Sequence, residues 1–452
     1  MKQASNDQLE KEIKLFRQEH PGISELEVNA VDIGGHFFGK RYPIAKLESF
    51  SKEGLSFPRS MFVYSTVGEP LTGIHYGNDD GDPDAHFFLI PGSLCLNDWG
   101  SQPRAQMMAT SYNEGEPTYF EPRNVLNKSL QAYTEHKLQP IVAFELEFYL
   151  FDRERDNQDL IKIVRNPKTG RLDTPTVLSS ARISDFELVI DDIIKYSGQQ
   201  GIETGAISAE MGVGQFEINF NHHTDVLRAA DEACLFKRTV LEVAKKHSMM
   251  ASFMAKPLLR QPGNGLHMHV SVVDSKGDNI FANGNKPHQR LLNAIGGLLD
   301  TMPAAMSLWA PNINSYRRFT GSYCAPVSRS WGNENRSAAF RIPLAKDGAW
   351  RVENRVCGAD ANPYLAMAAT LAGIWYGMEQ KRDPGKPIDD IVEEKDERLP
   401  LDLITALNTT FGSKALAGTL GKKFIELYCL QRKSETFAFE QFISPREYDW
   451  YL

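Results

Sequence analysis

Three short segments of the sequence carry acidic or imidazole side chains at every second residue, with apolar residues between them. They are 144–148 (FELEF), 216–220 (FEINF) and 266–270 (LHMHV). Because residues two apart share one face of a β-strand, each segment is predicted to be a strand with one apolar face and one face of potential metal ligands. Burying several carboxylates is costly unless they are paired or bind metal. The pattern therefore predicts a metal-dependent enzyme built on a β-sheet.

The composition sets the broad class of the protein. The chain has 452 residues, of which 42% are hydrophobic and 24% charged, as in a soluble globular protein with room for two or three domains. A net charge of −8 argues against nucleic acid as a partner and fits a protein that handles small charged molecules and cations. The five cysteines are scattered and form no C-x-x-C pair, which is typical of free thiols in a reducing compartment.

No targeting or membrane segment is expected. Residues 1–20 are charged throughout and lack the apolar run of a signal peptide. The longest largely apolar stretch, 364–378, is too short to span a bilayer. These features predict a cytoplasmic protein that does not bind membranes.

Local patterns predict two domains, a small N-terminal domain of mixed α and β character at 1–112 and a catalytic domain at 113–452. The first begins with an amphipathic helix at 6–18 and a strand pair at 26–43 that turns at Gly34 and Gly35. In the second, the predicted helices are 124–136, 185–200, 224–247 and 363–379, the last with Asp360 as its N-cap. The stretch 152–175 is predicted to be a surface insertion, 311–343 a long loop, and 381–400 a surface loop.

The candidate metal ligands comprise five carboxylates and one imidazole. They are Glu145, Glu147, Glu210, Glu217, His267 and Glu353. Such a set can hold two divalent cations at about three protein ligands each, which leaves positions for water and substrate. Oxygen-dominated ligation favours Mg²⁺ or Mn²⁺ over Zn²⁺. Each segment taken alone also fits a solvated sheet face, and only their combination favours a metal site.

A second group of candidate site residues consists of arginines. They are Arg317, Arg318, Arg336, Arg341, Arg351 and Arg355. Guanidinium groups bind carboxylates and phosphates in a bidentate fork and neutralise charge during phosphoryl transfer, although a structural ion-pair network is the alternative. The sequence has no P-loop, Rossmann or nucleophile-elbow motif. A bound nucleotide is therefore expected to be held chiefly by metals and arginines.

Over nearly its whole length the chain resembles the glutamine synthetases of the bacterial type. The matching stretches are AFELEFYL (143–150), EMGVGQFE (210–217), GNGLHMHVS (263–271), NSYRR (314–318), NRSAAFRIP (335–343), RVENR (351–355) and ANPY (361–364). Seven motifs in the expected order are highly specific. Within that superfamily, the chain looks most similar to the γ-glutamylpolyamine synthetases.

The resemblance implies an α+β fold, with a β-grasp-like N-terminal domain and an α/β catalytic domain on a curved antiparallel sheet. It implies ATP-dependent ligation of the glutamate γ-carboxylate to an amine through a γ-glutamyl phosphate, giving ADP and phosphate. It also implies two or more Mg²⁺ or Mn²⁺ ions per site. By the same resemblance the protein is expected to be a homo-oligomeric ring, a dodecamer, with active sites between subunits.

The resemblance also assigns roles to individual residues. One cation would be held by Glu147, Glu210 and Glu217, and the other by Glu145, His267 and Glu353. Glutamate would be bound at Gly263, Asn264, Arg318 and Arg355. Arg336 and Arg341 would stabilise the transferred phosphoryl group, with Arg341, His269 and Ser271 on the nucleotide side.

The chain departs from glutamine synthetases where those enzymes bind ammonium. Cys324 stands where they carry a glutamate, and the stretch 57–62, which aligns with their N-terminal aspartate loop, has no acid. Losing both anions favours an alkylamine, since each buried methylene gains about 0.8 kcal/mol. Tyr323 and Trp331 are candidates to line the amine slot, with loop packing as the alternative. The acidic stretch 79–84 is a candidate for the distal ammonium of a diamine, with a solvated loop as the alternative.

Two other functions stay open at this point. A glutamine synthetase that uses ammonium would share the ligands and arginines but should keep the acids of the ammonium site. A catalytically inactive family member with a structural role would be free to lose its ligands, and here all six ligand positions are filled. The sequence does not decide which amine is used, and putrescine, a longer polyamine, ethanolamine and simple alkylamines all fit.

Overall fold

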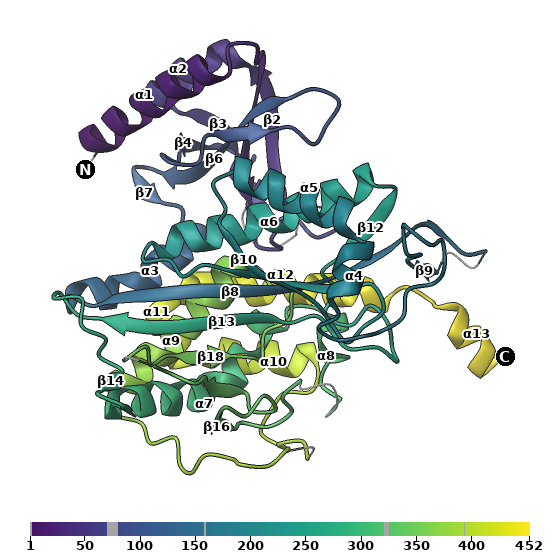
Figure 1. The fold of residues 1–452 in the computed structure, drawn as a ribbon. Helices are drawn as coiled ribbons and strands as arrows, with labels where there is room; N and C mark the ends of the chain where they lie inside the picture. Colours follow the sequence, from purple (N-terminus) through teal and green to yellow (C-terminus); the bar gives the residue numbers. More distant parts are fainter. Residues whose placement is uncertain (1, 70–79, 158–159, 321–324, 347, 393) are drawn as a thin grey trace.

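The computed structural model describes residues 2–69, 80–157, 160–320, 325–346, 348–392 and 394–452, with the side chains of 2–6 left out. Its N-terminal part is a twisted sheet with two helices beside it (Figure 1). The strands are β1 Glu25–Val31, β2 Phe37–Pro43, β3 Leu55–Pro58, β4 Asp84–Leu89, β5 Cys95–Asn97, β6 Arg104–Asn113 and β7 Glu116–Pro117. They follow the order β2-β1-β6-β4-β3, and β5 and β7 also pair with β6.

The two helices of this part are α1 Lys2–Glu19 and α2 Leu47–Glu53, and two short 3-10 turns lie at Ile44–Lys46 and Arg59–Phe62. Leu9, Ile13 and Phe16 are buried on one side of α1, which confirms the predicted amphipathic helix. The division of the chain at residue 112 stays a prediction. Strands of the first sheet continue to Pro117, and the next helix begins at Pro122.

The second sheet forms the centre of the molecule. Its strands are β8 Gln139–Arg155, β9 Ile161–Ile163, β10 Thr204–Ala209, β11 Gln215–Phe220, β12 Met249–Ser252, β13 Leu266–Val273, β16 Trp331–Asn333, β17 Phe340–Ile342 and β18 Val352–Asn354. Their order is β10-β11-β8-β13-β18-β17-β16, and β9 and β12 also pair with β8. All these pairs are antiparallel except β16 with β17, which is parallel. A small separate pair is formed by β14 Ala282–Asn283 and β15 Lys286–Pro287.

Helices lie on both sides of this sheet in Figure 1. They are α3 Pro122–Glu135, α4 Ser180–Asp185, α5 Glu187–Gln199, α6 Val226–Lys246, α7 Gln289–Trp309, α8 Ile313–Tyr316, α9 Pro363–Glu379, α10 Leu403–Phe411, α11 Lys414–Leu420, α12 Lys422–Glu440 and α13 Pro445–Tyr451. In that view α5 and α6 lie above β8, and α7, α9 and α10 lie below it. The four helices predicted in the catalytic domain are confirmed to within a few residues as α3, α5, α6 and α9. Helix α9 is buried along most of its length and packs against α7.

Two local predictions were wrong. The stretch 311–343 is not a continuous loop, because it contains α8, β16 and β17. Strands of three residues are too short to display the alternation that predicts a strand. The N-cap of α9 is Asn362, whose side chain accepts hydrogen bonds from the backbone N–H groups of Tyr364 and Leu365. Asp360 instead accepts hydrogen bonds from Asn312 and Ser315.

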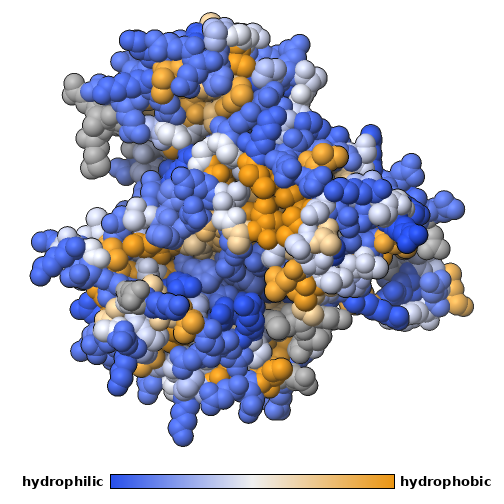
Figure 2. Space-filling view, in the orientation of Figure 1, coloured by the Kyte–Doolittle hydropathy of each residue, from blue (hydrophilic) through white to orange (hydrophobic). Residues whose placement is uncertain are grey.

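Two further properties bear on the sequence predictions. Among the described residues, one helix, α7, has the length and hydropathy of a membrane span, but 83% of that apolar window is buried inside the fold. The four described cysteines are buried free thiols, and Cys324 lies outside the described residues. Figure 2 shows a largely hydrophilic face with an apolar patch near its middle, below the N-terminal sheet.

Candidate active site

The register of the second sheet brings the three alternating segments side by side. Strand β8 lies between β11 and β13, so that Glu217 is paired with Glu147 and His267 with Glu145. The alternate residues therefore share one face of the sheet, while Phe144, Leu146 and Phe148 on β8 are buried on the other. The predicted arrangement of one apolar face and one ligand-rich face is confirmed.

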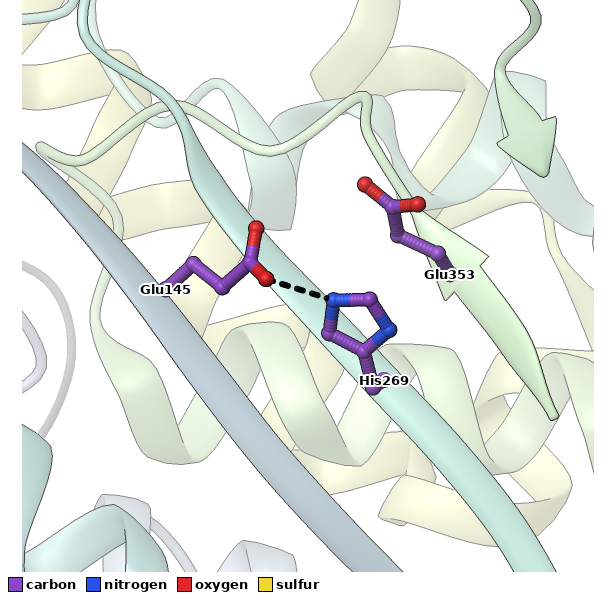
Figure 3. Close-up of side chains that lie close together, drawn as sticks. All are labelled: Glu145, His269 and Glu353. Atoms are coloured by element: carbon purple, nitrogen blue, oxygen red, sulfur yellow. Dashed lines mark hydrogen bonds and ion pairs between the residues drawn. The ribbon is translucent and has the colours of Figure 1, made fainter. Parts of the chain in front are cut away.

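Strand β18 adds a further carboxylate on the other side of β13, where Glu353 is paired with His269. Figure 3 shows Glu145, His269 and Glu353 on the same side of three adjacent strands, with the carboxylate of Glu145 facing the imidazole of His269. The distance from His269 Nε2 to Glu145 Oε1 is 3.0 Å. His267 Nδ1 lies 3.3 Å from Glu145 Oε2 and 4.0 Å from Glu353 Oε1.

Two overlapping groups in this cluster have the geometry of a metal site, with one donor atom per residue and all donors within 4.8 Å of each other. The groups are Glu145, His269 and Glu353, and Glu145, Glu217 and His267. His269 is therefore a candidate ligand in addition to its predicted place beside the nucleotide. Its Nδ1 atom is buried and has no hydrogen-bond partner. Imidazole and carboxylate donors together fit a divalent cation.

The remaining two predicted ligands approach from a tight turn and from β8. Glu210 follows β10, and its carboxylate accepts a hydrogen bond of 3.0 Å from Ser208 Oγ. Glu147 Oε2 accepts hydrogen bonds from the backbone N–H of Gly265, at 2.8 Å, and from Gln215 Nε2, at 3.2 Å. These bonds fix one oxygen of Glu147, while its other oxygen, Oε1, lies 4.0 Å from His267 Nε2.

The electrostatics of the cluster are those of a cation site. Burial and the charges of Glu147, Glu145 and Glu210 raise the pKa of Glu217 to about 9. Burial and the charge of Glu147 likewise raise the pKa of Glu210. Burial also acts to raise the pKa of Glu145, but the hydrogen bonds with His267 and His269 outweigh it, so that this pKa is well below its ordinary value. A bound cation would relieve the repulsion among these carboxylates.

Two arginines hold Glu353. Arg341 Nη1 lies 2.8 Å from one oxygen of this fully buried carboxylate, and Arg355 Nη1 binds the other oxygen. Burial opposes ionisation, but Arg355 and the histidines together lower the pKa of Glu353. Arg336 is exposed, and its charge acts on Glu210. The arginine cluster therefore contacts the ligand cluster and also forms part of an ion-pair network.

The residues predicted to bind glutamate lie at the edge of the cluster. Arg318 is buried and donates a hydrogen bond of 2.8 Å to the carbonyl of Val356. At Gly263 a Cβ atom would lie 2.8 Å from the Arg318 side chain and 2.4 Å from the carbonyl oxygen of Ala255. Glycine at this position is therefore needed to let Arg318 pack against the backbone.

Asn264, also predicted to bind glutamate, is held from several sides. Its residue is fully buried, and its side chain donates to the carbonyls of Ser252 and Met254 and accepts from Gln215 Nε2. Its backbone N–H and C=O are bonded to Ala255 and Ala359. These bonds fix the orientation of the side chain, and each carbonyl oxygen can still accept a further hydrogen bond, so the binding of glutamate by Asn264 stays a prediction.

A cavity of about 420 Å³ lies beside the cluster, and His269 and Ser271, two of the three residues predicted on the nucleotide side, line it. Glu145 and Arg351 are among the other residues that line it. This volume lies in the range of small-molecule pockets.

The predicted amine slot is only partly described. Cys324 and Tyr323 lie outside the described residues. Trp331 is 6% exposed, packs in the core and donates its indole N–H to the carbonyl of Gly385, which favours the alternative of structural packing. In the acidic stretch, of which Asp79 lies outside the described residues, Asp80 is paired with Arg59, and Asp82 Oδ2 accepts a hydrogen bond from Ser60 Oγ.

The sequence interpretation missed Gln215, which touches three parts of the site. Its Nε2 atom lies 3.2 Å from Glu147 Oε2, 3.0 Å from the Gly263 carbonyl and 3.1 Å from Asn264 Oδ1. The alternation of strand β11 could have revealed it, because residues 215, 217 and 219 share one face.

The fold and this cluster define a class of enzyme in which a curved sheet presents carboxylates and imidazoles for divalent cations, and arginines for anionic substrates. Comparisons with known proteins agree. Residues 120–451 match the glutamine synthetase catalytic domain, and the chain belongs to the glutamine synthetase family. It is an ATP-dependent ligase that forms carbon–nitrogen bonds.

Individual relatives cover the chain almost completely. It is 36% identical to γ-glutamylputrescine synthetase PuuA of Escherichia coli (strain K12), over 98% of this chain and 94% of that protein. It is 30% identical to glutamate–isopropylamine ligase of a Pseudomonas species, over 97% of each chain. Among solved structures, a complex of GmaS with ADP superimposes with a TM-score of 0.83 at 25% identity, over 97% of this chain and 98% of that one.

Proposed function

We propose that this protein uses ATP to join the γ-carboxylate of glutamate to an alkylamine, with putrescine as the first candidate. One observation carries the proposal. The complete set of ligands and arginines occurs together with Cys324 at the position where glutamine synthetases carry an ammonium-binding glutamate. The similarity to γ-glutamylputrescine synthetase and to glutamate–isopropylamine ligase supports an organic amine as the acceptor.

The donor set fits divalent cations, Mg²⁺ or Mn²⁺, because it is rich in carboxylates whose mutual repulsion a cation would relieve. The residues proposed to hold them are Glu145, Glu147, Glu210, Glu217, His267 and Glu353, with His269 as a further candidate. When bound, the cations offset the repulsion between the glutamate carboxylate and the triphosphate of ATP.

The proposed reaction has two steps. Arg318 and Arg355 orient glutamate, whose γ-carboxylate oxygen attacks the γ-phosphorus of ATP, so that ADP leaves and an acyl phosphate forms. Arg336 and Arg341 neutralise charge on the transferred group. The unprotonated amine then attacks the acyl carbon, phosphate leaves with the C–O bond electrons, and the amine proton passes to solvent. Holding the reactants in line supplies much of the rate enhancement.

The direct test is phosphate release from the purified protein with ATP, Mg²⁺ and glutamate. The acceptors are ammonium, methylamine, isopropylamine, ethanolamine, putrescine, cadaverine, spermidine and spermine. We expect release with one or more alkylamines to exceed release with ammonium by at least tenfold in kcat/KM. A preference for ammonium would make the protein a glutamine synthetase, and no release with any acceptor would favour the inactive alternative.

The acceptor assignment has its own test. Replacing the thiol by a carboxylate in Cys324→Glu should increase the use of ammonium relative to putrescine, because an anion would again bind the small cation. Cys324→Ser is the matched control and should keep the preference of the parent protein. An unchanged preference in Cys324→Glu would remove Cys324 from the acceptor site.

We also propose that the protein is a homo-oligomer. Large apolar side chains near the C-terminus are more than half exposed in the single chain. They are Phe437, Phe439, Phe442, Ile443, Trp450 and Tyr451. Exposed large apolar side chains concentrated in one segment favour an interaction site. Light scattering at micromolar concentration should give a mass several times 50.8 kDa, and the Phe442→Ser/Trp450→Ser double variant should lower it. A monomeric parent protein would contradict this.

A further inference from the structure

A buried ion pair outside the proposed ligand set holds the turn that carries Glu210. Asp173 and Arg182 have side chains 3% and 5% exposed, and Arg182 Nη2 lies 2.9 Å from Asp173 Oδ2. Asp173 belongs to the stretch 152–175 that the sequence predicts to be a surface insertion. Arg182 lies in the short helix α4 beside β10. Neither residue has a role in the reaction proposed above.

The pair binds the backbone of the turn 210–215, which joins β10 to β11. Arg182 Nη1 donates to the carbonyl of Glu210 at 2.7 Å, and Arg182 Nη2 donates to that of Gly212 at 3.0 Å. Asp173 Oδ2 also accepts a hydrogen bond of 2.7 Å from the N–H of Gly214. The backbone of Glu210, Gly212 and Gly214 is thus held by two side chains.

The turn is also closed by backbone hydrogen bonds from the Glu210 N–H to the Gln215 carbonyl, at 2.9 Å, and from the Leu150 N–H to the Gly214 carbonyl, at 2.8 Å. Gly214 has φ +72°, and a Cβ there would lie 2.5 Å from the carbonyl oxygen of Leu150. At Gly212 a Cβ would lie 1.9 Å from the hydroxyl oxygen of Tyr149. The turn is therefore packed tightly on β8 through glycine, and Gly212, whose carbonyl accepts a hydrogen bond from Arg182, is buried. A buried carbonyl that loses its donor costs about 1–3 kcal/mol.

The two ends of this turn meet two proposed ligands. Glu210 is its first residue, and Gln215 at its other end donates to Glu147 Oε2 at 3.2 Å. We propose that the Asp173–Arg182 pair is a positioning device that fixes the carboxylates of Glu210 and Glu147 for a divalent cation. This inference rests on the proposed metal site. The predicted surface insertion thereby gains a part in the site, through Asp173.

Partners that orient metal ligands typically contribute 10- to 100-fold to metal affinity. Arg182→Lys should therefore weaken Mn²⁺ binding by at least tenfold, because an ammonium is a point charge and cannot bond two separated carbonyls as a planar guanidinium does. Asp173→Asn keeps the guanidinium but removes the charge that holds it, and should weaken binding in the same direction. Asp173→Asn still tests the proposal if Arg182→Lys does not fold.

The chain offers a matched control. Arg123 and Asp231 form another largely buried pair, at 2.9 Å, which joins α3 to α6. Arg123→Lys should lower the melting temperature but leave Mn²⁺ affinity unchanged. This separates a positioning role from a general loss of stability.

The experiment titrates Mn²⁺ into chelator-treated protein without ATP or glutamate, measures free Mn²⁺ by electron paramagnetic resonance, and records a thermal melt of each variant. Wild-type affinity retained within twofold in folded Arg182→Lys and Asp173→Asn would overturn the positioning role. An equal loss in Arg123→Lys would overturn it as well. A parent protein that binds no Mn²⁺ would instead refute the metal site, which is a separate result.

Discussion

The raised pKa of Glu217 makes a quantitative prediction about metal binding. Burial and the charges of Glu147, Glu145 and Glu210 raise this pKa to about 9. At pH 7.5 a group with that pKa is protonated in roughly 30 molecules for each ionised one. A carboxylate must lose its proton to bind a cation, so binding of Mg²⁺ or Mn²⁺ at pH 7.5 should release about one proton per site.

Isothermal titration calorimetry measures this release directly. Mn²⁺ is titrated into chelator-treated protein in three weakly metal-binding buffers that differ in ionisation enthalpy, and the slope of the observed enthalpy against the ionisation enthalpy gives the number of protons. We expect a slope near one at pH 7.5 that falls below one half above pH 9. Over the same range the apparent affinity should increase by up to tenfold per pH unit until Glu217 is ionised.

Two variants make the assignment specific. Glu217→Gln cannot release the proton, and its slope should fall by about one even though its affinity is weaker. Glu121→Gln removes another buried carboxylate, whose pKa burial raises to about 8, but at a position outside the ligand cluster. Its slope should match that of the parent protein. A slope near zero in the parent protein, or the same slope with Glu217→Gln, would refute the reasoning.

Three further predictions concern stability. Gly297→Ala should lower the unfolding free energy by about 1–3 kcal/mol, because the new methyl group would lie 2.3 Å from the Gly373 carbonyl where α7 crosses α9. Urea denaturation measures this loss. The exposed control Gly418→Ala should be neutral or stabilising in the same assay. Burial favours the protonated form of Glu121 in the folded state. The contribution of Glu121 to the free energy of unfolding is therefore fully present below its unfolded pKa, and it falls by about 1.4 kcal/mol per pH unit as the pH rises toward 8. Denaturation at pH 6 and 7.5 should show a smaller pH dependence in Glu121→Gln, and an equal dependence would contradict the assignment. Glu353→Gln should cost about 3–5 kcal/mol, because two largely buried guanidinium groups lose this carboxylate; a melting temperature unchanged from the parent protein would count against it.

The sequence by itself determined the chemistry of the site. Period-two alternation fixes which side chains share a strand face, so the ligand-rich faces of β8, β11 and β13 could be predicted without knowing how the strands pair. Long helices such as α6 were also predictable, because a 3.6-residue period repeats several times along them. Short strands such as β16 and β17 were not, since three residues cannot display a period.

Only the tertiary structure decided which of these faces meet. Pairing of β13 with β8 and β18 places His269 against Glu145 and Glu353, and no spacing along the chain encodes that register. Packing likewise decides the hydrogen-bond partners of Asn264, which is completely buried. Asp173 and Arg182 lie in segments without a recognisable pattern, and they support the turn of Glu210 through contacts between residues distant in sequence. Local periodicity reports a side chain's direction, whereas its partners depend on long-range packing.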